Sequence, residues 1–217
     1  MFRDREDAGQ RLAAKLKRRE LRDPLVLAIP RGGIVIGGVL AQELGAELDV
    51  VLARKLRAPG QPELAIGAIS ETGQMYLNHH AEEFVESLGD YLDEERNHQL
   101  AEIERRKQLF RSVRPQAPVS GRSVIVTDDG IATGSTMIAG LKVIRAQEPY
   151  ELIVAVPVAS PSRLDQVRLW CDEVVCLARP EVFWAIGQFY DDFTQIDDEE
   201  ALDILAAAAR SASAETT

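Results

Sequence analysis

The sequence predicts an α/β fold with a mostly parallel sheet and helices on both faces. Short apolar runs alternate with amphipathic stretches, and prolines and glycines separate them. One of the apolar runs ends in two adjacent aspartates, which a turn of small residues follows. Strand–helix alternation is typical of parallel sheets, whose ligands bind beyond the carboxyl ends of the strands. The unusual residues of the chain are therefore expected on one rim of the sheet.

Apolar or β-branched runs bounded by turn residues predict the strands. They cover residues 24–30, 47–53, 124–127, 151–157 and 173–178, and two strands within 64–78 on either side of Thr72-Gly73. Residues 54–64, which read RKLRAPGQPEL, hold two prolines, a glycine and three cations. We expect a long loop there.

Apolar residues at helical spacing predict the helices. They cover residues 3–20, 34–44, 135–146, 161–170 and 199–209. Residues 79–112 interrupt the alternation with an apolar stripe, Gly89 and a heavily charged helix. They predict an inserted helical pair, which projects as a solvated amphipathic element or forms a dimer contact. Residues 211–217 are expected to be a disordered tail.

Composition limits the class of protein. The 217 residues are 46% hydrophobic and 28% charged, which suits a single domain over residues 1–217. A net charge of −10 repels nucleic acid and anionic lipid. Because no apolar run is long enough to span a membrane and the start lacks a secretory signal, we expect a cytoplasmic protein. Cys171 and Cys176 are expected to stay reduced.

The stretch from Val124 to Thr136, VIVTDDGIATGST, indicates a binding site. Neighbouring side chains on a strand point to opposite faces, so Asp128 and Asp129 can serve one ligand only where the strand ends and the chain turns. The small residues that follow open a helix at Ser135. The unpaired backbone amides of residues 133–136 would then form an anion site that a phosphate can approach closely.

Carboxylates beside a phosphate site are useful if they bind something other than the phosphate. They can accept hydrogen bonds from hydroxyl groups or help to hold a hydrated Mg²⁺. A ligand with a phosphate at one end and a diol next to it meets both conditions. The stretch therefore predicts a site for a sugar phosphate.

The same stretch resembles the phosphoribosyl-pyrophosphate (PRPP) motif of the type I phosphoribosyltransferases, in which a hydrophobic strand precedes two acids and a Thr-Gly-x-Thr phosphate loop. PRGGIVIGG at 30–38 resembles the pyrophosphate loop of that family, and Arg54-Lys55 resembles its basic pair. RAPGQPELAIGAISETG at 57–73 stands where the family has a flexible catalytic loop. The loops occur in the family's order over residues 20–180, and residues 179–198 take the place of its variable hood.

The resemblance implies a role for each matching residue. Asp128 and Asp129 would hold the ribose hydroxyls and approach Mg²⁺, directly or through water. Lys55, with Arg54, would neutralise the leaving group. Pyrophosphate would be bound by Arg31, Gly32 and Gly33. The 5-phosphate would be bound by Ala132, Thr133, Gly134, Ser135 and Thr136.

The chain also departs from the family pattern. Thr127 and Gly130 stand where apolar residues are usual, and Ala132 replaces the acid that acts as a base in hypoxanthine–guanine enzymes. DDGIATGSTM is locally closest to the adenine type, in which a glutamate of the flexible loop handles the proton of the base. Glu63 or Glu71 would play that part here.

The hood at 179–198 is rich in aromatic and acidic residues. Trp184, with Phe183, Phe189 and Tyr190, either stacks on a base or anchors an irregular cover onto the sheet.

These expectations describe a Mg²⁺-dependent glycosyltransferase that moves 5-phosphoribose from PRPP to a ring nitrogen of a nucleobase-like acceptor and releases pyrophosphate. Its partners would be these small molecules and a second copy of the chain, without nucleic acid or membrane. A PRPP- or nucleotide-binding regulator without turnover is a second possibility. An interaction protein built on residues 79–112 is a third. Arg54, Lys55 and Glu63 favour catalysis, because an active enzyme needs cations and closure at this place.

Overall fold

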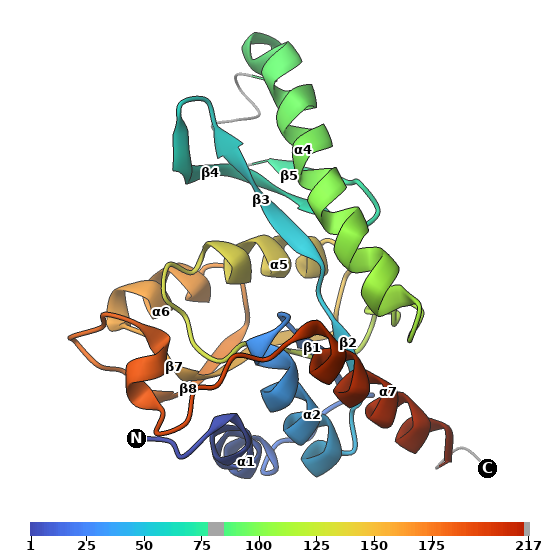
Figure 1. Cartoon of the computed structure of the whole chain (residues 1–217), viewed down its shortest axis with the longest axis vertical. Coiled ribbons are helices and arrows are strands. Elements are labelled where there is room, and N and C mark those ends of the chain that lie inside the picture. The colour runs from blue at the N-terminus through green and yellow to red at the C-terminus, as the bar shows by residue number, and fades with distance from the viewer. Residues whose placement is uncertain (78–84, 215–217) are drawn as a thin grey trace.

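The chain builds a five-stranded sheet covered by helices and an arm that projects from it (Figure 1). The computed structural model describes residues 1–77 and 85–214, with the backbone alone at 62, 63, 85–87 and 211–214. Within these described ranges, no helix combines the length and the apolar character that a membrane crossing requires.

The strands of the main sheet follow the order β2-β1-β6-β7-β8, and all neighbouring pairs are parallel. Their bounds are β1 Leu25–Ala28, β2 Glu47–Val50, β6 Ser123–Thr127, β7 Glu151–Val158 and β8 Glu173–Ala178. The register aligns Ala28 with both Val50 and Thr127, so three strands end on the same rim. The expected parallel sheet is confirmed.

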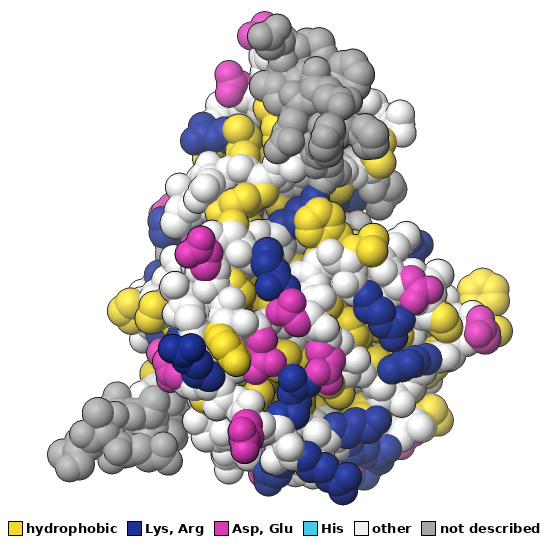
Figure 2. Space-filling view, turned by 180° about the vertical axis from the view of Figure 1, so that it is seen from behind, with side chains coloured by type: hydrophobic (Ala, Val, Ile, Leu, Met, Phe, Trp, Pro, Cys, Tyr) yellow, Lys and Arg dark blue, Asp and Glu magenta, His cyan; other side chains and the backbone are white. Residues whose placement is uncertain are grey.

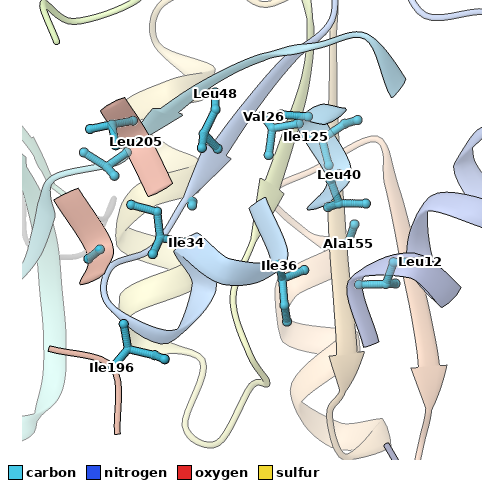
Figure 3. Packing of buried hydrophobic residues seen from close by; sticks show 14 of the residues in the cluster. Leu12, Val26, Ile34, Ile36, Leu40, Leu48, Ile125, Ala155, Ile196 and Leu205 are labelled. Atoms are coloured by element: carbon cyan, nitrogen blue, oxygen red, sulfur yellow. The ribbon is translucent and has the colours of Figure 1, made fainter. Parts of the chain in front are cut away.

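Helices cover both faces of this sheet (Figure 1). One face carries α1 (Arg5–Leu16), α2 (Gly32–Leu44) and α7 (Asp198–Ala214), and the other carries α5 (Ser135–Arg145) and α6 (Pro161–Arg168). Alternate strand residues pack against the two layers. Val26 packs in one buried cluster with Leu12 and Leu40 (Figure 3). Its neighbour Leu27 packs in the other cluster with Leu141. Each such burial contributes about 1.5–3 kcal/mol.

The arm consists of a small antiparallel sheet and one long helix. Its elements are β3 (Ala53–Ala58), β4 (Gln61–Ser70), β5 (Met75–Leu77) and α4 (Val85–Arg111). Two ion pairs hold α4 in place. Arg57 Nε of β3 donates to Glu95 Oε1 of α4 at 2.8 Å, within the arm. Arg111 Nη1 of α4 donates to Asp49 Oδ1 of β2 at 2.7 Å, in the main sheet. The arm is thereby fastened to the edge of the main sheet.

The prediction of a long loop over residues 54–64 is wrong, because β3 and β4 form a hairpin there. Gly60, with φ +68°, makes the turn after Pro59. The pairing then jumps from Ala58↔Gln61 to Arg57↔Ala65, so Pro62 falls in an unpaired bulge where its missing N–H breaks no ladder. The prolines that suggested a loop thus sit at the places where a hairpin tolerates them. The two strands expected around Thr72-Gly73 are present.

The insert and the C-terminus agree with the expectations in part. The insert expected at 79–112 is helical from Val85 to Arg111. Its backbone is non-helical at Gly89, where the sequence predicted an interruption. Residues 79–84 lie outside the described residues. The hood at 179–198 contains a short 3₁₀ helix, η1 (Ile186–Phe189). Helix α7 continues to Ala214, so residues 211–214 of the expected tail are helical, and 215–217 are not described.

Candidate active site

Two loops that follow neighbouring strands pack directly against each other at the rim. The loop after β1 leads to Gly32 and Gly33, and the loop after β6 carries Asp128 and Asp129. A Cβ atom on Gly33 would lie 2.9 Å from the Asp128 Cα, and one on Gly32 would lie 2.7 Å from the Asp129 Cγ. Only glycine, which has no Cβ, allows this approach. The peptide bond Pro30-Arg31, just before these glycines, is cis.

Of the acid pair, Asp129 is buried and Asp128 is half-buried, and Asp129 has a cationic partner. Asp129 is 8% exposed, and Arg5 of α1 donates to its Oδ2 through Nε at 3.0 Å and Nη2 at 2.9 Å. Asp128 Oδ1 accepts the backbone N–H of Asp129 at 2.9 Å. Burial raises the pKa of both carboxyl groups; the charge of Asp129 raises the pKa of Asp128 further, whereas Arg5 opposes the rise at Asp129. The pair is therefore poised to accept a cation or hydroxyl donors, either of which favours its charged form.

Replacing Asp128 with asparagine is expected to stabilise the protein at neutral pH. The folded-state pKa of Asp128 lies well above its ordinary 3.8, so folding favours the protonated carboxyl group. The stability that this group contributes is fully present below pH 3.8 and is lost as the pH rises through the raised pKa. Asparagine does not titrate, and its Oδ1 can still accept the Asp129 N–H. The melting temperature of Asp128→Asn minus that of the parent should therefore grow as the pH rises above about 4. A difference that stays constant over this range would contradict the prediction.

The predicted phosphate loop opens helix α5. Gly134 is the N-cap of the helix and has φ +81°, a conformation that glycine adopts without strain. Ala132, Thr133 and Thr136 are exposed, and Ser135 is half-buried. The cap residue itself offers no side-chain acceptor to the first N–H groups of the helix, and the Ser135 N–H donates to Thr133 Oγ1 across a long 3.4 Å. Backbone donors of this kind are what an anion needs. The Ile131 N–H donates to the Val158 carbonyl at 2.9 Å, which ties the loop to the end of β7.

The structure points the two members of the basic pair to opposite faces of β3. Arg54 Nε donates to Gln99 Oε1 of α4 at 2.7 Å. Lys55 pairs in register with Ala68, and Ala68 packs against Ala139 of α5. Cross-strand neighbours lie on the same face, so Lys55 is on the side of the arm that faces α5, the helix of the phosphate loop. The pair therefore serves two sides of the arm.

The two glutamates considered for proton transfer have different outcomes. Glu71 accepts hydrogen bonds from Arg111 Nε at 2.7 Å and Nη2 at 2.6 Å, and its side chain is 6% exposed. It is a buried ion-pair partner, so the expectation that it could handle a substrate proton is wrong. The side chain of Glu63 lies outside the described residues.

The N-terminal helix and the hood close around the acid pair. Tyr190 Oη donates to the Asp129 carbonyl oxygen at 2.7 Å, and burial raises the pKa of this phenol. Arg5 Nη1 donates to the Thr194 carbonyl at 2.8 Å, and its guanidinium lies 3.9 Å from the centre of the Phe193 ring. Arg5 had no signal in the sequence, because it is one of several arginines in an ordinary amphipathic helix and its partners are far along the chain.

The aromatic residues of the hood divide into two groups. Tyr190 is buried against Phe2 with ring centres 5.3 Å apart, and Phe183 and Phe189 pack together at 5.2 Å. Trp184, by contrast, is 87% exposed. The packed rings anchor the hood onto the sheet, and Trp184 presents an open aromatic face to solvent.

Asp128 and Asp129 are the residues that would hold a metal ion. Among the side chains that the structure describes, no group of three or more His, Cys, Asp or Glu residues could ligate one. Mg²⁺ commonly binds through one or two carboxylates, several waters and the phosphates of a substrate. The acid pair therefore fits an ion that arrives with a phosphorylated substrate, and it does not fit a metal held by protein ligands alone.

A parallel sheet that ends in a glycine-lined loop, an acid pair and a helix N-terminus defines an α/β protein with a candidate anion site at the rim of its sheet. A family model described as the phosphoribosyl transferase domain matches residues 3–194. The chain belongs to the phosphoribosyl transferase family, and its fold is the type I fold that the PRPP motif implied.

Relatives support this assignment over nearly the whole chain. Two curated Mycobacterium tuberculosis proteins that carry the provisional name phosphoribosyl transferase are each 40% identical over 210 residues, which is 97% of this chain and 47% of theirs. The chain thus spans about half the length of the curated relatives it matches. The crystal structure of a Thermus thermophilus protein is 43% identical, with a TM-score of 0.90 over 95% of this chain and 98% of that one.

Proposed function

We propose that the protein transfers 5-phosphoribose from PRPP to a ring nitrogen of a nucleobase-like acceptor and releases pyrophosphate. The observation that carries this proposal is the direct packing of Gly32 and Gly33 against Asp128 and Asp129. The two aspartates lie on the loop that ends at Gly134, the N-cap of α5. Contiguous groups are thereby offered to a pyrophosphate, a vicinal diol and a terminal phosphate. PRPP carries these three parts in that order.

Each part of the site would do one task in the reaction. Asp128 and Asp129 would accept hydrogen bonds from the ribose hydroxyls and would stabilise positive charge that develops on the sugar ring. The backbone N–H groups and hydroxyls of residues 132–136 would fix the 5-phosphate. Arg31 and the glycines beside it would bind the pyrophosphate, and Lys55 would add a cation from the arm. The chain would act mainly by alignment and charge stabilisation.

A Mg²⁺ ion at the acid pair would neutralise charge on the departing pyrophosphate. The residues of the chain must also exclude water, because water would hydrolyse PRPP. The β3–β4 hairpin stands in place of the expected flexible loop, and Lys55 lies on its face toward α5. We propose that this hairpin covers the substrate during the reaction.

The acceptor would meet the hood. Trp184, which is 87% exposed, is suited to stack on a planar base. Tyr190 instead holds the backbone of the acid pair through its hydrogen bond to the Asp129 carbonyl oxygen. Glu63 of the hairpin remains our assignment for the proton of the acceptor.

Figure 2 shows basic and acidic side chains next to one another across the middle of one face. Such a surface, on a chain of net charge −10, suits a small anion held at a local site rather than nucleic acid. A cytoplasmic homodimer completes the proposal.

One observation favours a second candidate, a PRPP- or nucleotide-binding regulator without turnover. Arg5 holds Asp129 through two hydrogen bonds, so a substrate diol must compete with an internal cation. A protein that binds PRPP without reacting would use the same loops. Turnover separates the two candidates.

The decisive experiment follows pyrophosphate release from PRPP and Mg²⁺ across a panel of purines, pyrimidines and other ring-nitrogen acceptors. We expect release with one acceptor class and a loss of about 100-fold or more in Asp129→Asn, because a group that touches the reacting sugar is removed. Asp165→Asn, which removes the same charge at an exposed position of α6, is the matched control and should keep full activity. PRPP binding without release for every acceptor would establish the regulator instead.

A further inference from the structure

Helix α4 brings an arginine to the loop that precedes the two glycines. Arg106 is half-buried, and its Nη1 donates to the Pro30 carbonyl oxygen at 3.4 Å. Gln99, which accepts the hydrogen bond from Arg54, lies two turns earlier on the same helix. Residues two turns apart share one helix face, so the face that carries Arg106 also meets Arg54.

Three arginines from three different elements gather at this place. Arg31 comes from the start of α2, Arg54 from β3 and Arg106 from α4. Burial lowers the pKa of Arg106, and the charges of Arg54, Arg105 and Arg31 lower it further. The carboxylate that opposes them is Asp198 of α7, which raises the pKa of Arg106 and lies 3.7 Å from Arg31 Nη1 through its Oδ1.

Such a gathering is unfavourable unless an anion neutralises it. Like charges that act on one another repel, and a partly buried charge needs a compensating partner. Among the residues that the structure describes, the charge of Asp198, whose side chain is 47% exposed, acts on Arg106 against the charges of Arg54, Arg105 and Arg31. Arginine is suited to bind two oxygens of a phosphate at once, since its donors lie in a fixed plane. The cluster also adjoins the glycines that we assign to pyrophosphate.

We propose that Arg106 binds the pyrophosphate group of the substrate, so that Arg31, Arg54 and Arg106 form one anion site, the three-arginine site. Helix α4 is then part of the active site and not only a support for the arm. The identity of the ligand rests on the proposed function, whereas the site itself rests on the position of the arginines. Binding of pyrophosphate would also draw Arg31 away from Asp198.

The test titrates inorganic pyrophosphate and, separately, ribose 5-phosphate into the full chain by calorimetry. Arg106→Gln should weaken pyrophosphate binding about tenfold or more, the usual effect of removing a charged hydrogen-bond donor. Arg168→Gln removes the same charge at an exposed position of α6 and should change the affinity less than about twofold. Ribose 5-phosphate, which reports on the loop at 132–136, should bind all three proteins alike.

Each outcome decides the proposal. Equal pyrophosphate affinity in the two variants, or no pyrophosphate binding by the parent, overturns it. If the parent binds no ribose 5-phosphate while pyrophosphate binding still depends on Arg106, the three-arginine site stands and the proposed function fails. If Arg106→Gln shows no cooperative melting, Asp198→Asn replaces it: removal of the opposing acid should raise pyrophosphate affinity several-fold, and an unchanged or lower affinity overturns the proposal.

Discussion

Replacing Gly33 with alanine is expected to reduce kcat/KM for the proposed release of pyrophosphate by about 100-fold or more. The added methyl group would lie 2.9 Å from the Asp128 Cα and from the Thr127 carbonyl oxygen, and backbone atoms cannot rotate out of its way. The two loops must therefore move apart, which displaces the acid pair from the proposed pyrophosphate donors at Gly32 and Gly33. A displacement of about 1 Å at reacting groups costs roughly 100-fold in rate. The overpacking itself should cost about 1–3 kcal/mol of stability, which urea unfolding measures.

Gly140→Ala provides the matched control for this prediction. Gly140 lies inside α5, and its Cβ would meet Val51 side-chain atoms at 3.4 Å and 3.6 Å, an ordinary contact. Alanine is favoured over glycine in a helix by about 1 kcal/mol, so this variant should be as active as the parent and slightly more stable. If Gly33→Ala behaved like Gly140→Ala, the loops would not need their close packing, and the proposed site would lose its main support.

Replacing Arg111 with leucine is expected to destabilise the protein by about 3–5 kcal/mol, because it leaves two buried carboxylates without their cation. Arg111 Nη1 pairs with Asp49 Oδ1 at 2.7 Å and Nη2 with Glu71 Oε1 at 2.6 Å, and Asp49 is 0% exposed. Nη2 also donates to the Val50 carbonyl at 3.2 Å. Urea unfolding of the variant and the parent measures the loss.

An exposed ion pair gives the comparison. Arg168 pairs with Asp165 at 2.8 Å, and the two side chains are 43% and 73% exposed. Arg168→Leu should therefore cost less than about 1 kcal/mol. Similar losses in Arg111→Leu and Arg168→Leu would show that the arm does not depend on the buried network.

Local patterns in the sequence were sufficient for the main sheet and for the acid pair. The strand expected at 173–178 is the strand observed, because short apolar runs between turn residues depend little on distant contacts. Asp128 and Gly134 could be placed at the sheet rim, since a parallel sheet puts all its strand ends on one side. The family resemblance then added the glycine loop after β1.

Other features could not be predicted, because they depend on contacts between distant parts of the chain. Nothing near Arg5 or Arg106 in the sequence distinguishes them from surface arginines, and their partners lie at Asp129 and Pro30. The hairpin at 54–64 was missed for another reason. Its prolines break the strand pattern locally, and only the bulge and the packing of α4 show why a ladder survives around them.

The contacts between the first residues and the hood have a consequence for synthesis on the ribosome. Phe2 N donates to the Phe189 carbonyl at 2.9 Å, Asp191 N donates to the Phe2 carbonyl at 2.8 Å, and Arg5 reaches Thr194 across 189 positions of the chain. Residues 2–5 must therefore wait until residues 189–194 have been synthesised before either segment finds its partner. Closing so long a separation is a slow event in folding. The nascent polypeptide can build most of its sheet early, but the surroundings of Asp129 are completed only after residues 189–194 have left the ribosome.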